Sequence, residues 1–118
     1  MPTAGAIGRQ LIASLQELLE ARGLSFRRAS AALDELGRPI PPLGFSRIIK
    51  GERRVDVDEL VVLSLLLGVT PSALLLPRDA DGAVVVALAP GARYPAAAAW
   101  AWADGRLPLD GDLDWFRR

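Results

Sequence analysis

Arginine supplies most of the chemistry that this chain could perform. Four basic side chains follow three prolines in the stretch GRPIPPLGFSRIIKGERRV, at Arg47, Lys50, Arg53 and Arg54. A guanidinium presents planar, forked N–H donors that fit phosphate oxygens and the O6 and N7 atoms of guanine. The types and spacing of these residues therefore make a polyanion the first ligand to consider.

The charges are distributed unevenly along the chain, although the formal net charge is zero. Residues 1–54 hold nine basic and five acidic side chains, whereas residues 55–118 hold five basic and nine acidic ones. Such an asymmetry can mark the half of a chain that binds a polyanion. The alternative is an ordinary solvated surface with uneven charge. Polyanion binding is favoured only if the arginines lie together on one functional surface.

The chain lacks residues on which several classes of protein depend. There is no histidine and no cysteine, so the commonest general base, thiolate metal sites and disulfides are all excluded. The alternating carboxylates of Asp110, Asp112 and Asp114 lack the further ligands of a calcium loop. We therefore predict no enzymatic activity, no cofactor and no metal.

The sequence also indicates the cellular location of the protein. No segment has the pattern of a signal peptide, and no apolar run reaches the roughly 18 residues of a membrane span. We expect a cytoplasmic protein with no membrane contact. Arginine far outnumbers lysine, and Ala, Leu, Gly and Pro are abundant, which is typical of a GC-rich bacterial genome.

The first half of the chain predicts three short helices. Apolar residues from Ile7 to Leu19 share one face of the first helix, which Gly23 ends. Ser25 is a suitable N-cap for the second helix, and Gly37 ends it. The prolines of RPIPP interrupt the helical pattern, so the third helix covers about residues 42–50.

Two further helices are expected before residue 77. Asp56 and Glu59 fit a capping box at the start of an almost wholly apolar helix that Gly68 ends. Because that helix is apolar all round, we expect it at the centre of the core or in an oligomer interface. Thr70 and Pro71 then begin a short fifth helix.

The chain changes character after residue 77. Residues 83–90, AVVVALAP, are the clearest strand candidate, and a strand needs a pairing partner. In YPAAAAWAWADG the alanines favour a helix, whereas Trp100 and Trp102 share a face only in a strand. We predict a compact, all-α, five-helix domain in residues 1–77. Residues 78–118 form a C-terminal extension with one short strand and a candidate helix.

The order of these elements resembles the Cro/CI-type (Xre-like) helix-turn-helix DNA-binding family, in an actinobacterial-type variant. The resemblance covers about residues 7–77 and rests on two family motifs. The first closes the recognition helix and is matched by Phe45, Ser46, Ile48 and Gly51. The second packs behind that helix and is matched by Leu60, Leu63, Leu67, Gly68, Val69, Pro71 and Leu74.

The chain departs from the family pattern at three places. Ile49 replaces a glutamate in the first motif. The second helix and the turn after it are longer than in phage repressors by roughly five residues. The third helix starts with Pro42, Leu43 and Gly44, where the family usually presents polar side chains to base edges.

The resemblance implies binding of double-stranded DNA, with residues 42–50 in the major groove. The residues that would face base edges are Pro42, Leu43, Gly44 and Arg47. The residues that would bind phosphates are Ser25, Arg27, Arg28, Ser46, Lys50, Arg53 and Arg54. Other partners remain open, because Arg47 could pair with Glu52, and Arg54 could pair with Asp56 or Asp58.

These implications favour a sequence-specific, repressor-like transcriptional regulator that binds DNA as a homodimer, because one module buries little DNA surface. The C-terminal extension would make the dimer, or bind a second protein, through Val84, Val86, Trp100, Trp102, Trp115 and Phe116. Packing within the chain is the other interpretation of the two tryptophans at 100 and 102. The alternative function is a protein-interaction adaptor or antitoxin-like subunit that keeps the fold with little or no DNA binding. The apolar start of the third helix and the zero net charge favour that alternative.

Overall fold

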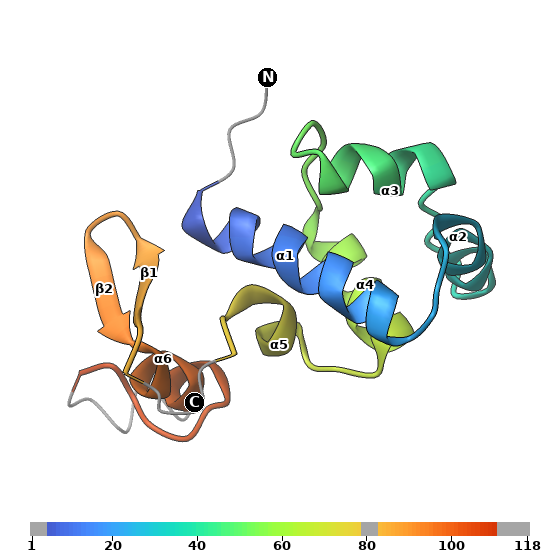
Figure 1. Ribbon diagram of the computed structural model, residues 1–118. Helices are drawn as coiled ribbons and strands as arrows, with labels where there is room; N and C mark the ends of the chain where they lie inside the picture. Colours follow the sequence, from blue (N-terminus) through green and yellow to red (C-terminus); the bar gives the residue numbers. More distant parts are fainter. Residues whose placement is uncertain (1–4, 79–82, 111–118) are drawn as a thin grey trace.

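Local capping interactions set the ends of most helices in the computed structural model of the chain, which describes residues 5–78 and 83–110. The part of the chain so described folds into six helices and one two-stranded hairpin (Figure 1). The helices are α1 (Ala6–Ala21), α2 (Phe26–Glu35), α3 (Pro42–Ile49), α4 (Val57–Leu67), α5 (Pro71–Leu75) and α6 (Ala96–Ala103). The strands are β1 (Val85–Ala89) and β2 (Ala92–Pro95).

The five helices expected before residue 77 are confirmed, and so are their caps. The Ser25 hydroxyl accepts a hydrogen bond from the Arg28 amide at 3.2 Å, at the start of α2. Asp56 and Glu59 form the predicted capping box, in which each side chain accepts from the backbone amide of the other. Gly68, with a φ of +68°, ends α4 in the left-handed conformation that glycine adopts without strain.

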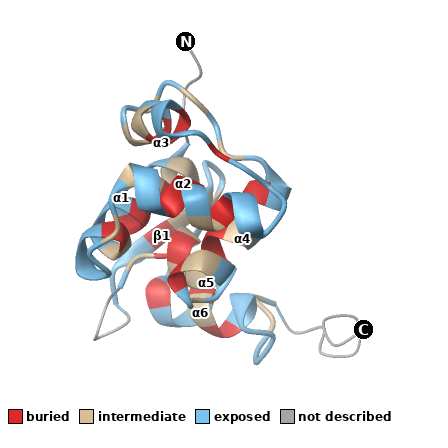
Figure 2. Ribbon diagram, turned by 90° about the vertical axis from the view of Figure 1, so that its right-hand side faces the viewer, coloured by how far each residue is buried: buried red, intermediate tan, exposed pale blue. Residues whose placement is uncertain are grey.

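The first core cluster fills the space enclosed by α1 to α5, and Figure 2 shows the buried faces of these helices turned inward. Its fully buried members include Leu15, Leu33, Phe45 and Leu63, from four different helices. The Phe26 and Phe45 rings stack with centroids 5.9 Å apart, which fixes α2 against α3. The orientation of α3 is therefore set by aromatic packing on its inner side.

The ends of α1 and α4 are joined by a side chain. The Arg22 guanidinium, at the end of α1, donates two hydrogen bonds of 3.0 and 2.8 Å to the Leu67 carbonyl oxygen. Carbonyls in the last turn of a helix have no partner within the helix, so a cation is favourable there. This contact holds the carboxyl end of α4 on the end of α1.

The C-terminal extension contains two strands where one was predicted. β1 confirms the strand expected in residues 83–90, and its partner is β2, which pairs antiparallel to it across the turn at Pro90 and Gly91. The register shifts between Ala87 and Ala89, so the strand bends before the turn. The sequence ARYP of β2 carries little strand propensity, which is why its pairing was missed.

Residues 96–103 form a helix, which settles the ambiguity of the tryptophan pair. α6 begins directly after β2, and the Ala96 amide donates to the Val84 carbonyl at 2.7 Å. Trp100 is half-buried, and its indole N–H donates to the Pro77 carbonyl at 3.0 Å. The helix propensity of the four consecutive alanines therefore outweighs the strand-like spacing of the two tryptophans.

A second core cluster lies between the hairpin, α6 and the first turn of α1. Its buried members are Leu76, Val86, Ala96 and Ala99, and Ile7, Leu88 and Trp100 pack against it. The helix α1 thus contributes Ile7 to the second cluster and its later leucines to the first. The division of the chain at residue 77 stays a prediction, because the two clusters share a helix.

The helix α4 is covered on one side only within the single chain. Leu63 and Leu67 are buried, whereas Val57, Val61 and Leu65 are 77%, 46% and 64% exposed. Because these three recur every fourth residue, they form one stripe on the outer side of the helix. The expectation of a helix at the centre of the core is wrong for that side, and an oligomer interface there stays a prediction.

Among the helices described, none is long and apolar enough to cross a membrane.

Candidate nucleic-acid interface

The outer side of α3 carries four of the eleven residues that were expected to meet DNA, namely Pro42, Leu43, Arg47 and Lys50. The helix begins at Pro42, after Pro41 in the N-cap position, because a proline in the first turn loses no helical hydrogen bond. Pro42, Arg47 and Lys50 are exposed, and Leu43 is 61% exposed. No acidic residue occurs between Pro42 and Gly51. The outer side of α3 is therefore a surface with apolar residues at its start and cations toward its end.

Two of the predicted contacts on α3 lie away from this surface. Gly44 is buried, and a Cβ atom built on it would lie 3.0 Å from Ile40 Cγ2 and 3.4 Å from Pro41 Cδ. Its role in the structure is close packing of α3 against the preceding turn, which leaves no face of Gly44 for a base. Ser46 is half-buried, between the inner and outer sides of the helix.

The amino-terminal end of α2 places a second pair of cations beside α3. Arg27 and Arg28 follow the Ser25 cap in the first turn, and all three residues are exposed. The stacked Phe26 and Phe45 rings join the two helices directly beneath. The first-turn amides and the two guanidinium groups make this end of α2 favourable for an anion.

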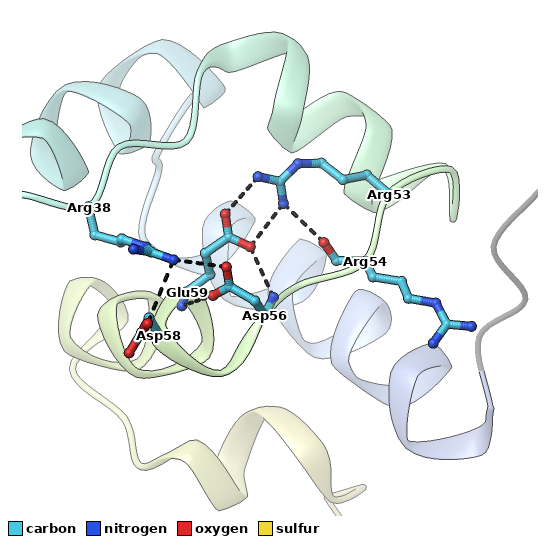
Figure 3. A network of polar contacts seen from close by, with 6 residues as sticks. All are labelled: Arg38, Arg53, Arg54, Asp56, Asp58 and Glu59. Carbon is cyan, nitrogen blue, oxygen red and sulfur yellow. Dashed lines mark hydrogen bonds and ion pairs between the residues drawn. The ribbon is translucent and has the colours of Figure 1, made fainter.

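Arg53, a predicted phosphate ligand, is engaged within the chain instead (Figure 3). Its guanidinium makes a two-pronged contact with the Glu59 carboxylate, at 2.6 Å from Nη2 and 3.0 Å from Nη1. Nη1 also donates to the Arg54 carbonyl oxygen at 3.0 Å. The Glu59 side chain is 8% exposed and the Arg53 side chain is 31% exposed, so the carboxylate of this ion pair is buried and its guanidinium is partly buried.

Arg38 completes the network and was not singled out in the sequence. Its Nη2 lies 3.0 Å from Asp56 Oδ2 and 3.7 Å from Asp58 Oδ2, so it connects the turn before α3 to the start of α4. No local signal could have identified this pair, because 18 residues separate Arg38 from Asp56. The Arg54 side chain points away from Asp56 and Asp58 in Figure 3.

The network lowers the pKa values of the Asp56 and Glu59 carboxyl groups and raises those of Arg38 and Arg53. The pKa of the Asp56 carboxyl lies below its usual range, chiefly because the Glu59 amide donates to it, with help from Arg38. Burial raises the pKa of the Glu59 carboxyl, but hydrogen bonds from Arg53 and the Asp56 amide outweigh burial and leave it lowered. The same contacts raise the pKa values of Arg53 and Arg38. All four groups are therefore charged at neutral pH.

The six residues assigned to a dimer or partner contact have different positions. Val84 is 55% exposed and Trp102 is 40% exposed, so both are accessible on the extension. Val86 is buried and Trp100 is half-buried, and both pack in the second core cluster. Trp115 and Phe116 lie outside the described residues. Packing within the chain is thus the role of two of the six.

No set of three His, Cys, Asp or Glu side chains is arranged to hold a metal ion in residues 5–78 and 83–110. Comparison of the chain with protein-family models, with curated proteins and with solved structures gave no match.

Proposed function

We propose that the chain is a sequence-specific, double-stranded-DNA-binding transcriptional regulator of the helix-turn-helix type, repressor-like in action, with α3 in the major groove. The observation that carries the proposal is the combined outer surface of α2 and α3. It presents Arg27, Arg28, Arg47 and Lys50 to solvent, with no acidic residue in α3 or in the first turn of α2.

Some residues of this surface position the protein on the DNA backbone, and others discriminate between bases. Arg27 and Arg28 at the start of α2, together with Lys50 at the end of α3, neutralise phosphates. Arg47 is the side chain on α3 with forked donors for guanine O6 and N7, and Leu43 offers an apolar contact to a thymine methyl. Ser25 has a smaller share, because its hydroxyl already accepts from the Arg28 amide.

A selection of bound sites from random duplex DNA, followed by measurement of Kd, tests the proposal. Arg47→Ala is expected to lose about 1–3 kcal/mol at one base position and to relax the preference there. Arg106→Ala is the matched control, because Arg106 is an exposed arginine paired with Asp104 after α6. Failure of the wild-type chain to enrich any sequence, or equal binding by the Arg47 and Arg106 variants, would reject sequence-specific recognition.

The proposed regulator works as a homodimer through its C-terminal extension. Among the described residues, β1 and β2 pair only with each other, and Val84 and Val85 are exposed next to and at the start of β1. Sedimentation of the purified chain tests this assignment. Val85→Asp is expected to give monomers, whereas Leu65→Asp on α4 is not. The reverse result would move the interface to the exposed stripe of α4.

A protein-interaction adaptor or antitoxin-like subunit is the second candidate, and the exposed apolar start of α3 favours it. Leu43 is 61% exposed beside Pro42, an arrangement suited to an apolar partner surface. Binding to duplex DNA across a range of salt concentrations separates the two functions, because phosphate neutralisation makes affinity fall with salt. An absence of DNA binding at low salt would favour the adaptor.

A further inference from the structure

A cavity of about 610 Å³ is lined by none of the α2 and α3 side chains proposed above to bind DNA, and it includes Arg54, a predicted phosphate ligand, in its wall. Three separate parts of the chain enclose it: the first turns of α1, the turn between α3 and α4, and the end of the β1–β2 hairpin. Figure 1 shows the hairpin beside the start of α1. The volume is within the range of about 300–1,000 Å³ found for small-molecule sites.

Among the described residues that line the cavity, four are arginines and none is acidic. Arg9 comes from α1, Arg53 and Arg54 from the turn after α3, and Arg93 from β2. Arg53 is engaged by Glu59, so its charge is largely compensated. A guanidinium has five N–H donors, so an arginine that already has a partner can also donate to an anion.

The remaining wall is apolar and distinguishes this cavity from a simple phosphate contact. Ile7, Ile12 and Leu88 contribute to it from α1 and β1, and Val55 closes it from the turn before α4. Burial of alkyl surface against these side chains favours a ligand with a hydrocarbon body. The first turn of α1 also lines the cavity, and it has no acidic residue and no side-chain cap at Gly5.

We propose that this cavity binds a small amphipathic anion, a compound with a carboxylate or phosphate head and an apolar body. Arg9, Arg54 and Arg93 hold the head, and the isoleucines and Leu88 contact the body. A bound anion would join the hairpin to the turn that directly follows α3. The binding event itself does not depend on the proposed DNA recognition, so it is tested without DNA.

Isothermal titration of the full chain with octanoate and with octyl phosphate tests the site and distinguishes the two head groups. At least one of these is expected to bind at least tenfold more tightly than 1-octanol, which lacks the charge, and than inorganic phosphate, which lacks the body. Equal affinity for octanol and both anions, or no heat with either anion at millimolar concentration, would overturn the proposal.

Variants then assign the site to the cavity. Arg9→Gln and Arg93→Gln are each expected to weaken the preferred anion about tenfold, whereas Arg93→Lys keeps the charge and loses less. Arg106→Gln, outside the cavity, is the matched control and should bind as the wild type does. Circular dichroism confirms that each variant is folded. Unchanged affinity in the folded Arg9→Gln/Arg93→Gln double variant would place the binding elsewhere and overturn the assignment.

Discussion

Arg53 Nη2 lies 2.6 Å from Glu59 Oε2, and this contact joins the segment after α3 to the first turn of α4. The same carboxylate accepts the Asp56 amide in the capping box, so one buried side chain serves both a helix start and an ion pair. The predicted DNA contact at Arg53 thus has a structural partner within the chain. Of the two arginines in this turn, Arg53 therefore supports the start of α4.

Loss of the buried carboxylate should destabilise the fold. We expect Glu59→Ala to lower the free energy of unfolding by about 2–4 kcal/mol, because it removes a capping interaction and leaves Arg53 without its partner. Glu17→Ala is the control: Glu17 pairs with Arg78 on the surface, and such pairs contribute about 0–1 kcal/mol. Urea unfolding measures both values. Equal stability of the two variants would contradict the assigned role of Glu59.

Stability should decline on the acid side because Asp56 and Glu59 have lowered pKa values in the folded chain. The unfolded chain then binds more protons than the folded chain as the pH falls. The stabilising contribution is therefore complete above the unfolded carboxyl pKa of about 4 and is lost below it. The urea midpoint measured from neutral pH to about pH 3 should fall less in Asp56→Asn/Glu59→Gln than in the wild type. An equal fall in both chains would mean that other carboxyl groups dominate.

Gly44→Ala should destabilise the chain, although alanine is normally the better helix former by about 1 kcal/mol. The new Cβ would lie 3.0 Å from Ile40 Cγ2, and Ile40 is fully buried and cannot move aside readily. We expect a net loss of about 0.5–2 kcal/mol. Gly91→Ala, in the hairpin turn with nothing within 4 Å of its Cβ position, is the control. A gain in the melting temperature of Gly44→Ala would refute the packing role.

The cations of α2 should set the salt dependence of DNA binding. Each phosphate contact contributes about −0.9 to the slope of log affinity against log salt. We expect Arg27→Ala/Arg28→Ala to reduce the magnitude of the slope by about 1.8 while keeping the preferred sequence. Fluorescence anisotropy with a duplex at several salt concentrations measures it. An unchanged slope would remove the two arginines from the phosphate contacts.

Arg53→Ala is a poor test of DNA contact, because Arg53 forms the ion pair with Glu59. It leaves a buried carboxylate without its cation, so reduced binding would follow from a weakened start of α4. Arg54→Ala leaves that ion pair in place and is the better choice. Comparison of the melting temperatures of the two variants separates the effects: Arg53→Ala should show the larger decrease.

The indole hydrogen bond of Trp100 should stabilise the extension. Trp100→Phe keeps most of the ring packing but loses the bond to the Pro77 carbonyl, and we expect a loss of about 1 kcal/mol. Trp102→Phe, at a residue 40% exposed, should change stability less. Thermal unfolding followed by circular dichroism compares them. A larger effect at Trp102 would indicate that the exposed ring is covered by a second copy.

Features with a local cause could be predicted from the sequence. The caps at Ser25, Thr70 and the Asp56–Glu59 pair depend on residues three positions apart, and Gly23 and Gly68 each terminate the helix just before them. The bounds of α3 followed from its flanking prolines and Gly51. These interactions join residues that are close in the sequence, so the bounds of five helices could be predicted to within a few residues.

Features that depend on distant partners could not be predicted. The short strand β2 exists because β1 pairs with it, and its own residues give little sign of a strand. The Arg38–Asp56 pair and the burial of Gly44 against Ile40 depend on how the turn before α3 is folded. The candidate DNA-binding surface stays a prediction, whereas Arg53 and Gly44 have inward-directed roles that only the tertiary contacts reveal.

The sharing of α1 between two core clusters has a consequence for the order in which the chain folds during synthesis. All the buried members of the first cluster lie between Leu11 and Leu74 in the sequence, so that cluster can close early. Ile7 must wait for Val86 and Ala99, which a ribosome adds much later. The first turn of α1 therefore stays open on the nascent chain while its remaining turns are already packed. A chaperone that recognises apolar residues would find its binding site there, at Ile7, until α6 emerges.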